Sequence, residues 1–263
     1  MRKHEHKNEQ DQPLLPFCLD ITPSTRHDKI LKAVEFCKKT SDNLAIERML
    51  LNENVYPVAG VDEVGRGPLA GPVTAAALIL PRDWIIHGLP KELSGLTDSK
   101  RLSPAKRNKI FEELSSNPEV IFAIDFVDAH TIDRLNILNA TLLAMQTAVN
   151  HLKKRPVHVI IDGNVAPDLD MPATPIVKGD LYSATISAAS IIAKVARDKL
   201  MQRMDLKYPG YGFAKHKGYG TAQHIKAIRK MGVCEIHRKT FLQGILSKFA
   251  GPGAFYEGFL GKD

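Results

Sequence analysis

Two short apolar runs that each close on an aspartate constrain the fold of this chain more than any other feature. VAGVD ends at Asp62, and VIIDG carries Asp162 in front of a glycine. Short apolar runs bounded by turn residues are typical of strands that are buried on both faces. In open α/β sheets the functional groups gather outside the carboxyl ends of the strands. We therefore expect the two aspartates to lie side by side, although either one alone is more often a turn former or a helix cap.

The remaining periodic segments extend this pattern to a mixed sheet. Two further apolar runs predict strands at 73–80 and 119–127. Apolar residues at helical spacing predict helices over 27–40, 43–54, 102–115, 128–154, 182–204 and 221–231. Segment 128–154 is expected to be one long amphipathic helix, and small residues in 182–204 favour close packing on the sheet. The order of elements indicates an α/β fold with a mixed central sheet, helices on both faces and a helical C-terminal part.

The chain length fits one well-packed domain with an appendage rather than two full domains. Residues 1–56 are polar and charge-balanced, and we expect them to form an N-terminal extension that is partly helical or disordered. Residues 57–250 are expected to form the main α/β domain. The last segment, 251–263, is expected to be a C-terminal tail, either flexible or a docking peptide.

Basic residues are concentrated in one part of the chain. The formal net charge is +7, and residues 1–56 hold 9 Lys and Arg against 9 Asp and Glu, so the excess of 27 over 20 lies after them. Segment 178–230 alone has 11 basic residues against 3 acidic ones. General solubility charge is the alternative, but a basic segment that begins beside acids favours a phosphate backbone held near a metal. Affinity for such a partner is expected to fall with salt.

The cysteines and the N-terminus favour an unsecreted protein. Cys18, Cys37 and Cys234 form no CxxC pair, and an odd number leaves no complete disulfide framework. The first residues lack the apolar core of a signal peptide, and no run of about 18 apolar residues occurs. We expect a cytoplasmic protein that makes no membrane contact and acts as a monomer.

Four acids are candidate metal ligands: Asp62, Glu63, Asp162 and Asp180. Clustered carboxylates repel one another unless cations neutralise them, and oxygen ligands without histidine or cysteine favour Mg²⁺ or Mn²⁺. Asp180 precedes the small-residue segment, where a helix cap explains it equally well. Neighbouring side chains on a strand point to opposite faces, so Glu63 joins the cluster only if the pleat is lost there.

The loop GRGPLAG follows the first pair of acids. It lacks the GxxxxGK[ST] pattern of a nucleotide-binding loop and leads into a second apparent strand, which excludes a Rossmann fold. Gly65 and Gly67 leave bare backbone on either side of Arg66, so main-chain groups there can approach a ribose closely. A tight connection without function is the simpler interpretation of such a loop on its own.

Taken together, a series of segments closely resembles bacterial ribonuclease HII. From about Val58 to Phe241 they occur in uninterrupted order: VAGVDEVGRGPLAGPV, LTDSKRLSPAKR, INILNATLLAM, VIIDGN, VKGD, ISAASIIAKVARD, YPGYGFAKHKGYGT and GVCEIHRKTF. The resemblance implies a ribonuclease H-like catalytic domain with a C-terminal helical substrate-binding part. It also implies hydrolysis of the RNA strand of RNA–DNA hybrids and cleavage 5′ to single ribonucleotides embedded in duplex DNA, leaving 3′-hydroxyl and 5′-phosphate ends.

The resemblance also implies residue roles. The four metal-binding acids fall on Asp62, Glu63, Asp162 and Asp180, which would hold two divalent ions, Mn²⁺ or Mg²⁺. The backbone of Gly65, Arg66 and Gly67 would read the ribose 2′-hydroxyl, and Tyr219 would stack on the neighbouring deoxyribose. Ser99 and Lys100 match residues near the substrate phosphates. Without the resemblance, Lys100 reads as a surface lysine, Tyr219 as a half-buried core residue, and His216 and His224 as surface or packing residues.

Two other classes of function remain alternatives. A related metal-dependent DNA nuclease or polynucleotidyl transferase would use the same carboxylates without needing a 2′-hydroxyl. A non-catalytic nucleic-acid-binding protein would not need the acids, yet all four positions are filled. The sequence leaves open whether the protein contacts a sliding clamp.

Overall fold

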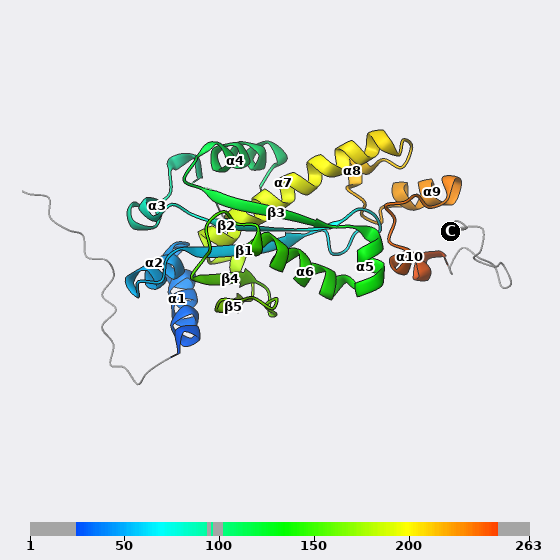
Figure 1. Cartoon of the computed structure of the whole chain (residues 1–263). Coiled ribbons are helices and arrows are strands. Elements are labelled where there is room, and N and C mark those ends of the chain that lie inside the picture. The colour runs from blue at the N-terminus through cyan, green and yellow to red at the C-terminus, as the bar shows by residue number, and fades with distance from the viewer. Residues whose placement is uncertain (1–24, 94–95, 97–101, 247–263) are drawn as a thin grey trace, which may run out of the picture.

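The structure is a computed structural model that describes residues 25–93, 96 and 102–246. The predicted substrate residues Ser99 and Lys100 and the C-terminal tail lie outside the described residues. Five strands form one mixed sheet in the order β3-β2-β1-β4-β5, which confirms the predicted mixed sheet (Figure 1). The strands are β1 (Val58–Val64), β2 (Val73–Ile79), β3 (Ile121–Val127), β4 (His158–Asp162) and β5 (Ala173–Ile176).

The sheet combines two kinds of pairing. β1, β2 and β3 form an antiparallel meander, whereas β4 lies parallel to β1 and β5 parallel to β4. The last parallel pair between β1 and β4 joins Val61 to Ile161, so Asp62 and Asp162 follow directly after it. The two aspartates therefore lie on adjacent parallel strands, as expected, but only Asp162 ends its strand, because β1 continues to Val64.

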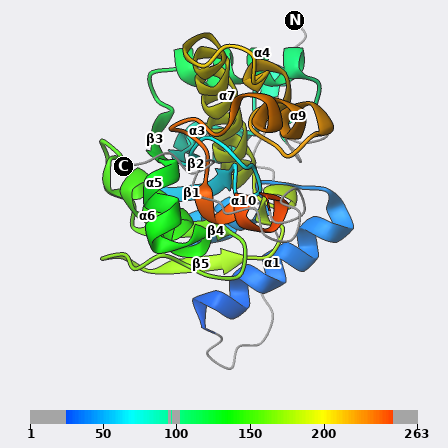
Figure 2. The same cartoon turned by 90° about the vertical axis from the view of Figure 1, so that its right-hand side faces the viewer.

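Helices cover both faces of the sheet. One apolar cluster joins the sheet to α4 (Pro104–Ser116) and α7 (Ala184–Lys207), and a second joins it to α5 (Ala129–Leu135) and α6 (Ile137–Asn150). Figure 2 shows α4 and α7 at the top of the molecule and α5 and α6 at one side. The predicted helix start at Pro104 is confirmed, because the Ser103 side chain accepts the Lys106 amide and caps α4.

The small residues of α7 allow this helix to lie directly on the sheet. Gly60 in β1 faces the first turn of α7, where an added Cβ would lie 2.5 Å from the backbone carbon of Thr185. Ala184, Ala188 and Ala189 are fully buried in the same contact layer. A larger residue at any of these positions would push the helix away from the strand that carries Asp62.

One predicted helix and one missed strand require correction. Segment 128–154 is not a single helix, because Asn136 adopts a positive φ of 68° and separates α5 from α6. Its side chain accepts the amide of Asn139 and caps the second helix. Asparagine tolerates this backbone region better than other non-glycine residues, and the apolar spacing continues across the break, so periodicity alone could not show it. The short strand β5 follows proline-rich sequence and was not expected.

The helices at 27–40 and 43–54 are confirmed as α1 (Arg26–Thr40) and α2 (Ala45–Asn52). Buried Ile30, Ile46 and Leu50 from these helices share an apolar cluster with Val58 of β1 and Ile160 of β4. Residues 26–52 therefore pack on the edge of the sheet that carries β4 and β5. The boundary of an extension at residue 56 stays a prediction.

The C-terminal part is helical, as predicted. Its helices are α8 (Phe213–His216), α9 (Ala222–Met231) and α10 (Lys239–Leu246), and Figure 1 shows them at the end of the molecule reached by the C-terminal half of α7. The other short helices are α3 (Arg82–His87), η1 (Lys91–Leu93) and η3 (Gly179–Leu181). No helix within the described ranges is long and apolar enough to cross a membrane.

A buried histidine makes the stability of the fold depend on pH. His158 in β4 is 2% exposed, its Nε2 lies 3.0 Å from the Thr174 hydroxyl, and its Nδ1 has no hydrogen-bond partner among the described residues. Burial lowers the pKa of His158 to about 4. Between pH 6.5 and pH 4 the unfolded chain therefore binds a proton that the folded chain rejects, and stability falls as the pH falls.

We expect acidification from pH 7 to pH 4.5 to remove roughly 2 kcal/mol of stability through His158 alone. The measurement is urea unfolding of the wild type and of His158→Gln at both pH values. The glutamine does not titrate, so the wild type should lose stability relative to this variant on acidification. A difference between the two proteins that stays constant with pH would contradict this assignment.

Candidate active site

Asp62 lies near the end of β1 and is almost fully buried. Its side chain is 5% exposed, its Oδ1 accepts the Glu63 amide at 2.7 Å, and Ser190 of α7 donates a hydrogen bond to the same carboxylate. Burial raises the pKa of Asp62 well above its ordinary value, and the charges of Glu63 and Asp162 raise it further. A buried carboxylate beside two other carboxylates is electrostatically costly, and a cation would relieve that cost.

Glu63 joins this cluster even though β1 does not end there. Residues 63 and 64 still pair with β2, so the expected loss of the pleat at Glu63 is wrong. At Glu63 only the parallel pairing of β1 with β4 has ended, which leaves space beside β1 on the side of β4. Burial raises the pKa of Glu63, Arg66 opposes this shift from 3.4 Å, and Asp162 adds to it. The longer glutamate side chain thus lies within electrostatic reach of Asp162.

Asp162 and Asp180 are connected through one backbone amide. Gly179 donates to Oδ1 of Asp162 at 2.7 Å, and Asp180 is the next residue, in the single turn of η3. Asp180 is 7% exposed. The turn begins at Lys178, which has a positive φ of 59°. The segment from Lys178 to Asp180 therefore bends back over the end of β4 and brings the fourth acid to the same edge of the sheet.

The donor set suits a hard divalent cation. All four side chains are carboxylates, and the pKa values of Asp62 and Glu63 are raised, mainly by burial and further by the charge of Asp162. Within the described residues, no three His, Cys, Asp and Glu side chains are already arranged as a complete metal site. The fit rests on the chemistry of the carboxylates and on their convergence at the ends of β1 and β4.

The GRG loop is held in place by a buried arginine to which sequence reasoning assigned no role. Arg238 is fully buried, and its guanidinium donates to the carbonyl oxygens of Gly65 at 2.6 Å, Arg66 at 2.8 Å and Gly71 at 3.0 Å. Burial lowers the pKa of Arg238 to about 9, and neighbouring Arg197 contributes. One side chain from the C-terminal part thus fixes the loop that follows the acids.

Arg197 of α7 supports the same loop from the other side. Its guanidinium donates to the carbonyl oxygens of Pro72, Ala70 and Lys217. Gly65 has a positive φ of 89°, and an added Cβ would lie 2.2 Å from Arg197 Nε, so only glycine fits there. Arg197 and Arg238 lie within segments that resemble the family, but nothing in their sequence context distinguishes a buried guanidinium from a surface one.

Tyr219 lies beside the GRG loop and is exposed. An added Cβ on Gly67 would be 4.0 Å from the Tyr219 ring, and the side chain is 41% exposed, which does not fit a half-buried core residue. The preceding Gly218 accepts the Leu69 amide through its carbonyl, which anchors the tyrosine segment to the loop. The structure therefore brings the predicted ribose-reading loop and the predicted stacking tyrosine together.

His216 and His224 are packing residues rather than surface ones. They stack with ring centroids 4.4 Å apart, and both contact the ring of Phe213 edge-on. His224 Nε2 also lies 3.1 Å from Nε2 of His237, and burial lowers the pKa of both rings to about 4. The three histidine rings pack around Phe213 next to the Tyr219 segment, because the Tyr219 amide donates to the His216 carbonyl and the Tyr219 carbonyl lies 3.0 Å from His224 Nδ1.

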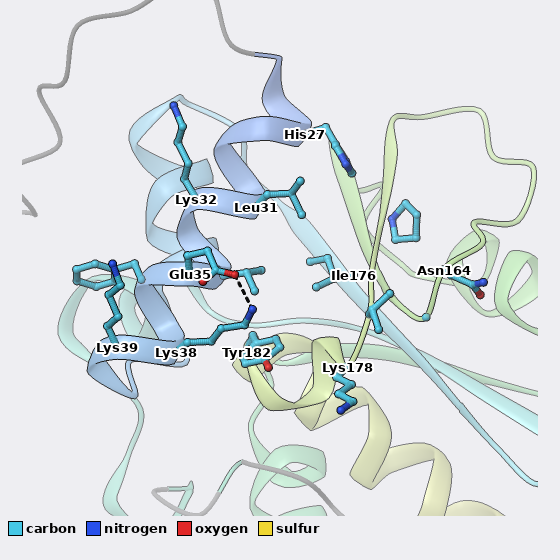
Figure 3. A pocket seen from close by; sticks show the side chains of 15 residues that line it. His27, Leu31, Lys32, Glu35, Lys38, Lys39, Asn164, Ile176, Lys178 and Tyr182 are labelled. Atoms are coloured by element: carbon cyan, nitrogen blue, oxygen red, sulfur yellow. Dashed lines mark hydrogen bonds and ion pairs between the residues drawn. The ribbon is translucent and has the colours of Figure 1, made fainter.

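A cavity of about 1080 Å³ lies next to the carboxylates, between α1 and the ends of β4 and β5. Gly163 and Asn164, which follow Asp162, form part of its lining, and Lys178, which precedes η3, forms another part. Figure 3 shows Lys38 of α1 pointing toward Glu35, with which it forms an ion pair of 2.5 Å. The lining includes lysines of α1 but none of the four acids.

The strand order and the two aspartates at adjacent carboxyl ends define an α/β protein of the ribonuclease H-like class. The family model described as Ribonuclease HII matches residues 59–243. The chain belongs to the ribonuclease HII family and is therefore a nuclease of the hydrolase class.

Curated relatives share close to half of their residues with this chain. It is 48% identical over 201 residues to the Ribonuclease HII of Caldicellulosiruptor saccharolyticus, which covers 76% of this chain and 94% of that protein. It is 52% identical over 184 residues to the Ribonuclease HII of Coxiella burnetii strain Dugway 5J108-111, covering 70% of this chain and 87% of that protein.

Solved structures agree on the fold. The ribonuclease H2 of Pyrococcus horikoshii OT3 superposes with a TM-score of 0.61 at 28% identity, over 73% of this chain and 98% of that one. The RNase HII of Archaeoglobus fulgidus, whose structure was solved as a complex with PCNA, superposes with a TM-score of 0.59 at 22% identity, over 77% of this chain and 100% of that one. The second similarity bears on the fold alone.

Proposed function

We propose that this protein hydrolyses the RNA strand of RNA–DNA hybrids and cuts 5′ to single ribonucleotides in duplex DNA. The observation that carries this proposal is the convergence of Asp62, Glu63 and Asp162 beyond the last parallel pair of β1 and β4, in a chain of the ribonuclease HII family. We further propose that it acts as a monomer in the cytoplasm. The products would carry 3′-hydroxyl and 5′-phosphate ends.

Asp62, Glu63, Asp162 and Asp180 would hold two Mg²⁺ or Mn²⁺ ions. Such ions, when bound, lower the pKa of the attacking water and stabilise the negative charge on the leaving oxygen. Asp62 is the most buried of the acids at the strand ends, and the charges of both Glu63 and Asp162 raise its pKa, which supports Asp62 as a ligand of the proposed metal ions. Ser190 orients the Asp62 carboxylate from α7, so helix and strand together fix its position.

Discrimination of ribonucleotides would depend on Gly65, Arg66 and Gly67, with Tyr219 beside them. Arg238 donates hydrogen bonds to the carbonyl oxygens of Gly65 and Arg66, so that these peptide groups keep one orientation. A 2′-hydroxyl is the feature that separates a ribonucleotide from its deoxy neighbours, and rigid backbone groups can bond it without reading the base. The exposed ring of Tyr219 offers a flat surface for the adjacent sugar.

The test is cleavage of a labelled DNA duplex that carries one ribonucleotide, beside the same duplex made only of DNA. With Mg²⁺ or Mn²⁺ we expect a single cut on the 5′ side of the ribonucleotide, no cut in the all-DNA duplex, and no cut in EDTA. Equal cutting of both duplexes would instead favour the alternative, a DNA nuclease or polynucleotidyl transferase that ignores the 2′-hydroxyl. Cutting in EDTA would contradict the metal requirement.

A further inference from the structure

Glu47 of α2 is a buried carboxylate that belongs to neither the proposed metal site nor the substrate loop. It is 1% exposed and lies in the part of the chain that precedes the residues matched by the family model. Its Oε1 accepts the Ser183 hydroxyl at 2.5 Å and the Thr185 amide at 3.0 Å. A buried carboxylate is costly unless it is hydrogen-bonded. The two hydrogen bonds show that Glu47 contacts the segment at the start of α7.

Two further contacts join the same part of the chain to residues 182–185. The carbonyl oxygen of Asn43 accepts the Ala184 amide at 2.7 Å, and the Cys37 thiol donates to the Tyr182 carbonyl at 3.2 Å. Residues 37–47 therefore contact four consecutive residues at the start of α7. The side-chain amide of Asn43 also donates to the Leu96 carbonyl at 2.7 Å, a few residues before the predicted substrate residues.

Ser183 links Glu47 directly to the turn that carries Asp180. The Ser183 amide donates to the Gly179 carbonyl at 2.9 Å and closes η3, while its hydroxyl is bonded to Glu47. The amide of Gly179 is in turn bonded to Asp162. A continuous chain of hydrogen bonds therefore runs from Glu47 through Ser183 and Gly179 to Asp162, with Asp180 enclosed in the turn.

The contact between Glu47 and the start of α7 also affects the position of Asp62. Ser190, which bonds the Asp62 carboxylate, lies on α7 less than two turns after Thr185. The backbone of Thr185 packs directly on Gly60 of β1, so the start of α7 has a fixed position on the sheet. Holding the first turn of α7 therefore fixes the Ser190 hydroxyl relative to Asp62 as well.

We propose that Glu47 is a positioning residue that sets Asp180 relative to Asp62 and Asp162 so that the four acids bind divalent cations together. The inference rests on the proposed function, because it takes these acids as metal ligands. A carboxylate suits the position because it accepts both donors and brings no donor of its own. Glutamine would bury an NH₂ group where the other carboxylate oxygen, Oε2, has no hydrogen-bond partner among the described residues.

The test measures Mn²⁺ affinity directly, by electron paramagnetic resonance of free Mn²⁺ in the absence of nucleic acid. Outer groups that orient metal ligands typically contribute about 10- to 100-fold in affinity. We expect Glu47→Gln and Ser183→Ala each to weaken Mn²⁺ binding by about tenfold or more. Because the two side chains act through one hydrogen bond, the double variant should lose much less than the product of the single losses.

Glu53→Gln is the matched control. Glu53 follows α2, forms an ion pair with Lys29 and touches none of residues 179–185 in the hydrogen-bond and ion-pair network of the described residues. This variant should bind Mn²⁺ as the wild type does. Activity should follow the same pattern: Glu47→Gln should need more Mn²⁺ for half-maximal rate and recover most of the maximal rate at high Mn²⁺.

The outcomes separate the two proposals. If wild type binds Mn²⁺ and Glu47→Gln, folded by circular dichroism, binds it equally well, Glu47 supports only the fold and the positioning role is wrong. Should Glu47→Gln lower the melting temperature without changing Mn²⁺ affinity, the same conclusion follows. If the wild type itself binds no Mn²⁺, the metal site of the proposed function is wrong, and the role of Glu47 in it is wrong with it.

Discussion

Asp62→Asn is expected to lower the cleavage rate by about 10³-fold or more while leaving the protein folded. Metal-assisted charge stabilisation is worth several kcal/mol in the transition state, and each 1.36 kcal/mol is a factor of ten in rate. Asparagine keeps the shape of the side chain but removes the negative charge that interacts with Glu63 and Asp162. The measurement is single-turnover cleavage of the duplex with one ribonucleotide, under saturating enzyme.

The same variant should be more stable than the wild type in EDTA. The raised pKa of Asp62 shows that its charge is disfavoured in the folded protein without a cation, so removing that charge relieves repulsion. Adding Mn²⁺ should raise the melting temperature of the wild type far more than that of Asp62→Asn. Asp170→Asn, at an exposed position outside the cluster, serves as the control. Retained activity in Asp62→Asn would contradict the role of Asp62.

Arg238→Met is expected to destabilise the protein by about 4 kcal/mol and to lower the melting temperature by roughly 10 °C. The reason is that three carbonyl oxygens, two in buried bonds and one in a part-buried bond, lose a charged donor at once, and methionine cannot replace any of those bonds. Arg238→Lys should be intermediate, because an ammonium cannot reproduce the fork geometry of the guanidinium. Urea unfolding at pH 7 measures both effects.

Loss of Arg238 should also lower activity. The carbonyls of Gly65 and Arg66 would no longer be held, so the folded fraction of Arg238→Lys should cut the ribonucleotide-containing duplex with a lower kcat/KM. Arg203→Met, at an exposed position of α7, is the control for the change in charge. An Arg238→Lys protein with unchanged stability and unchanged kcat/KM would show that the loop holds its shape without the arginine.

The pairing of the two aspartates could be predicted because the signal is local. VAGVD and VIIDG are short, apolar and closed by an acid, and their length and flanking glycine and proline residues favour buried strands over helices. The helices predicted over 102–115 and 221–231 depend on similarly local signals, and in the structure Ser103 and Thr221 cap them through the next few residues. Local patterns of this kind depend on a few neighbouring side chains.

The break at Asn136 was not predictable from periodicity. A single residue with positive φ interrupts the helix, while the apolar spacing on both sides remains helical. The short strand β5 was hidden in a similar way, because its sequence contains a proline and its pairing partner β4 lies elsewhere in the chain. The assignment of Glu63 also needed the structure, since the sequence does not show that β1 keeps pairing with β2 after leaving β4.

By itself, the sequence determined the class of fold and the family and predicted the four acids as metal ligands, because strand patterns and motif order are properties of contiguous residues. Only the tertiary structure showed how those acids are held. Arg238 bonds a loop more than 160 residues earlier, and Glu47 bonds Ser183 136 residues later. Hydrogen bonds between such distant segments depend on how the helices pack against the sheet. In the sequence, a charged residue that makes such hydrogen bonds in the interior cannot be distinguished from one that is exposed to water.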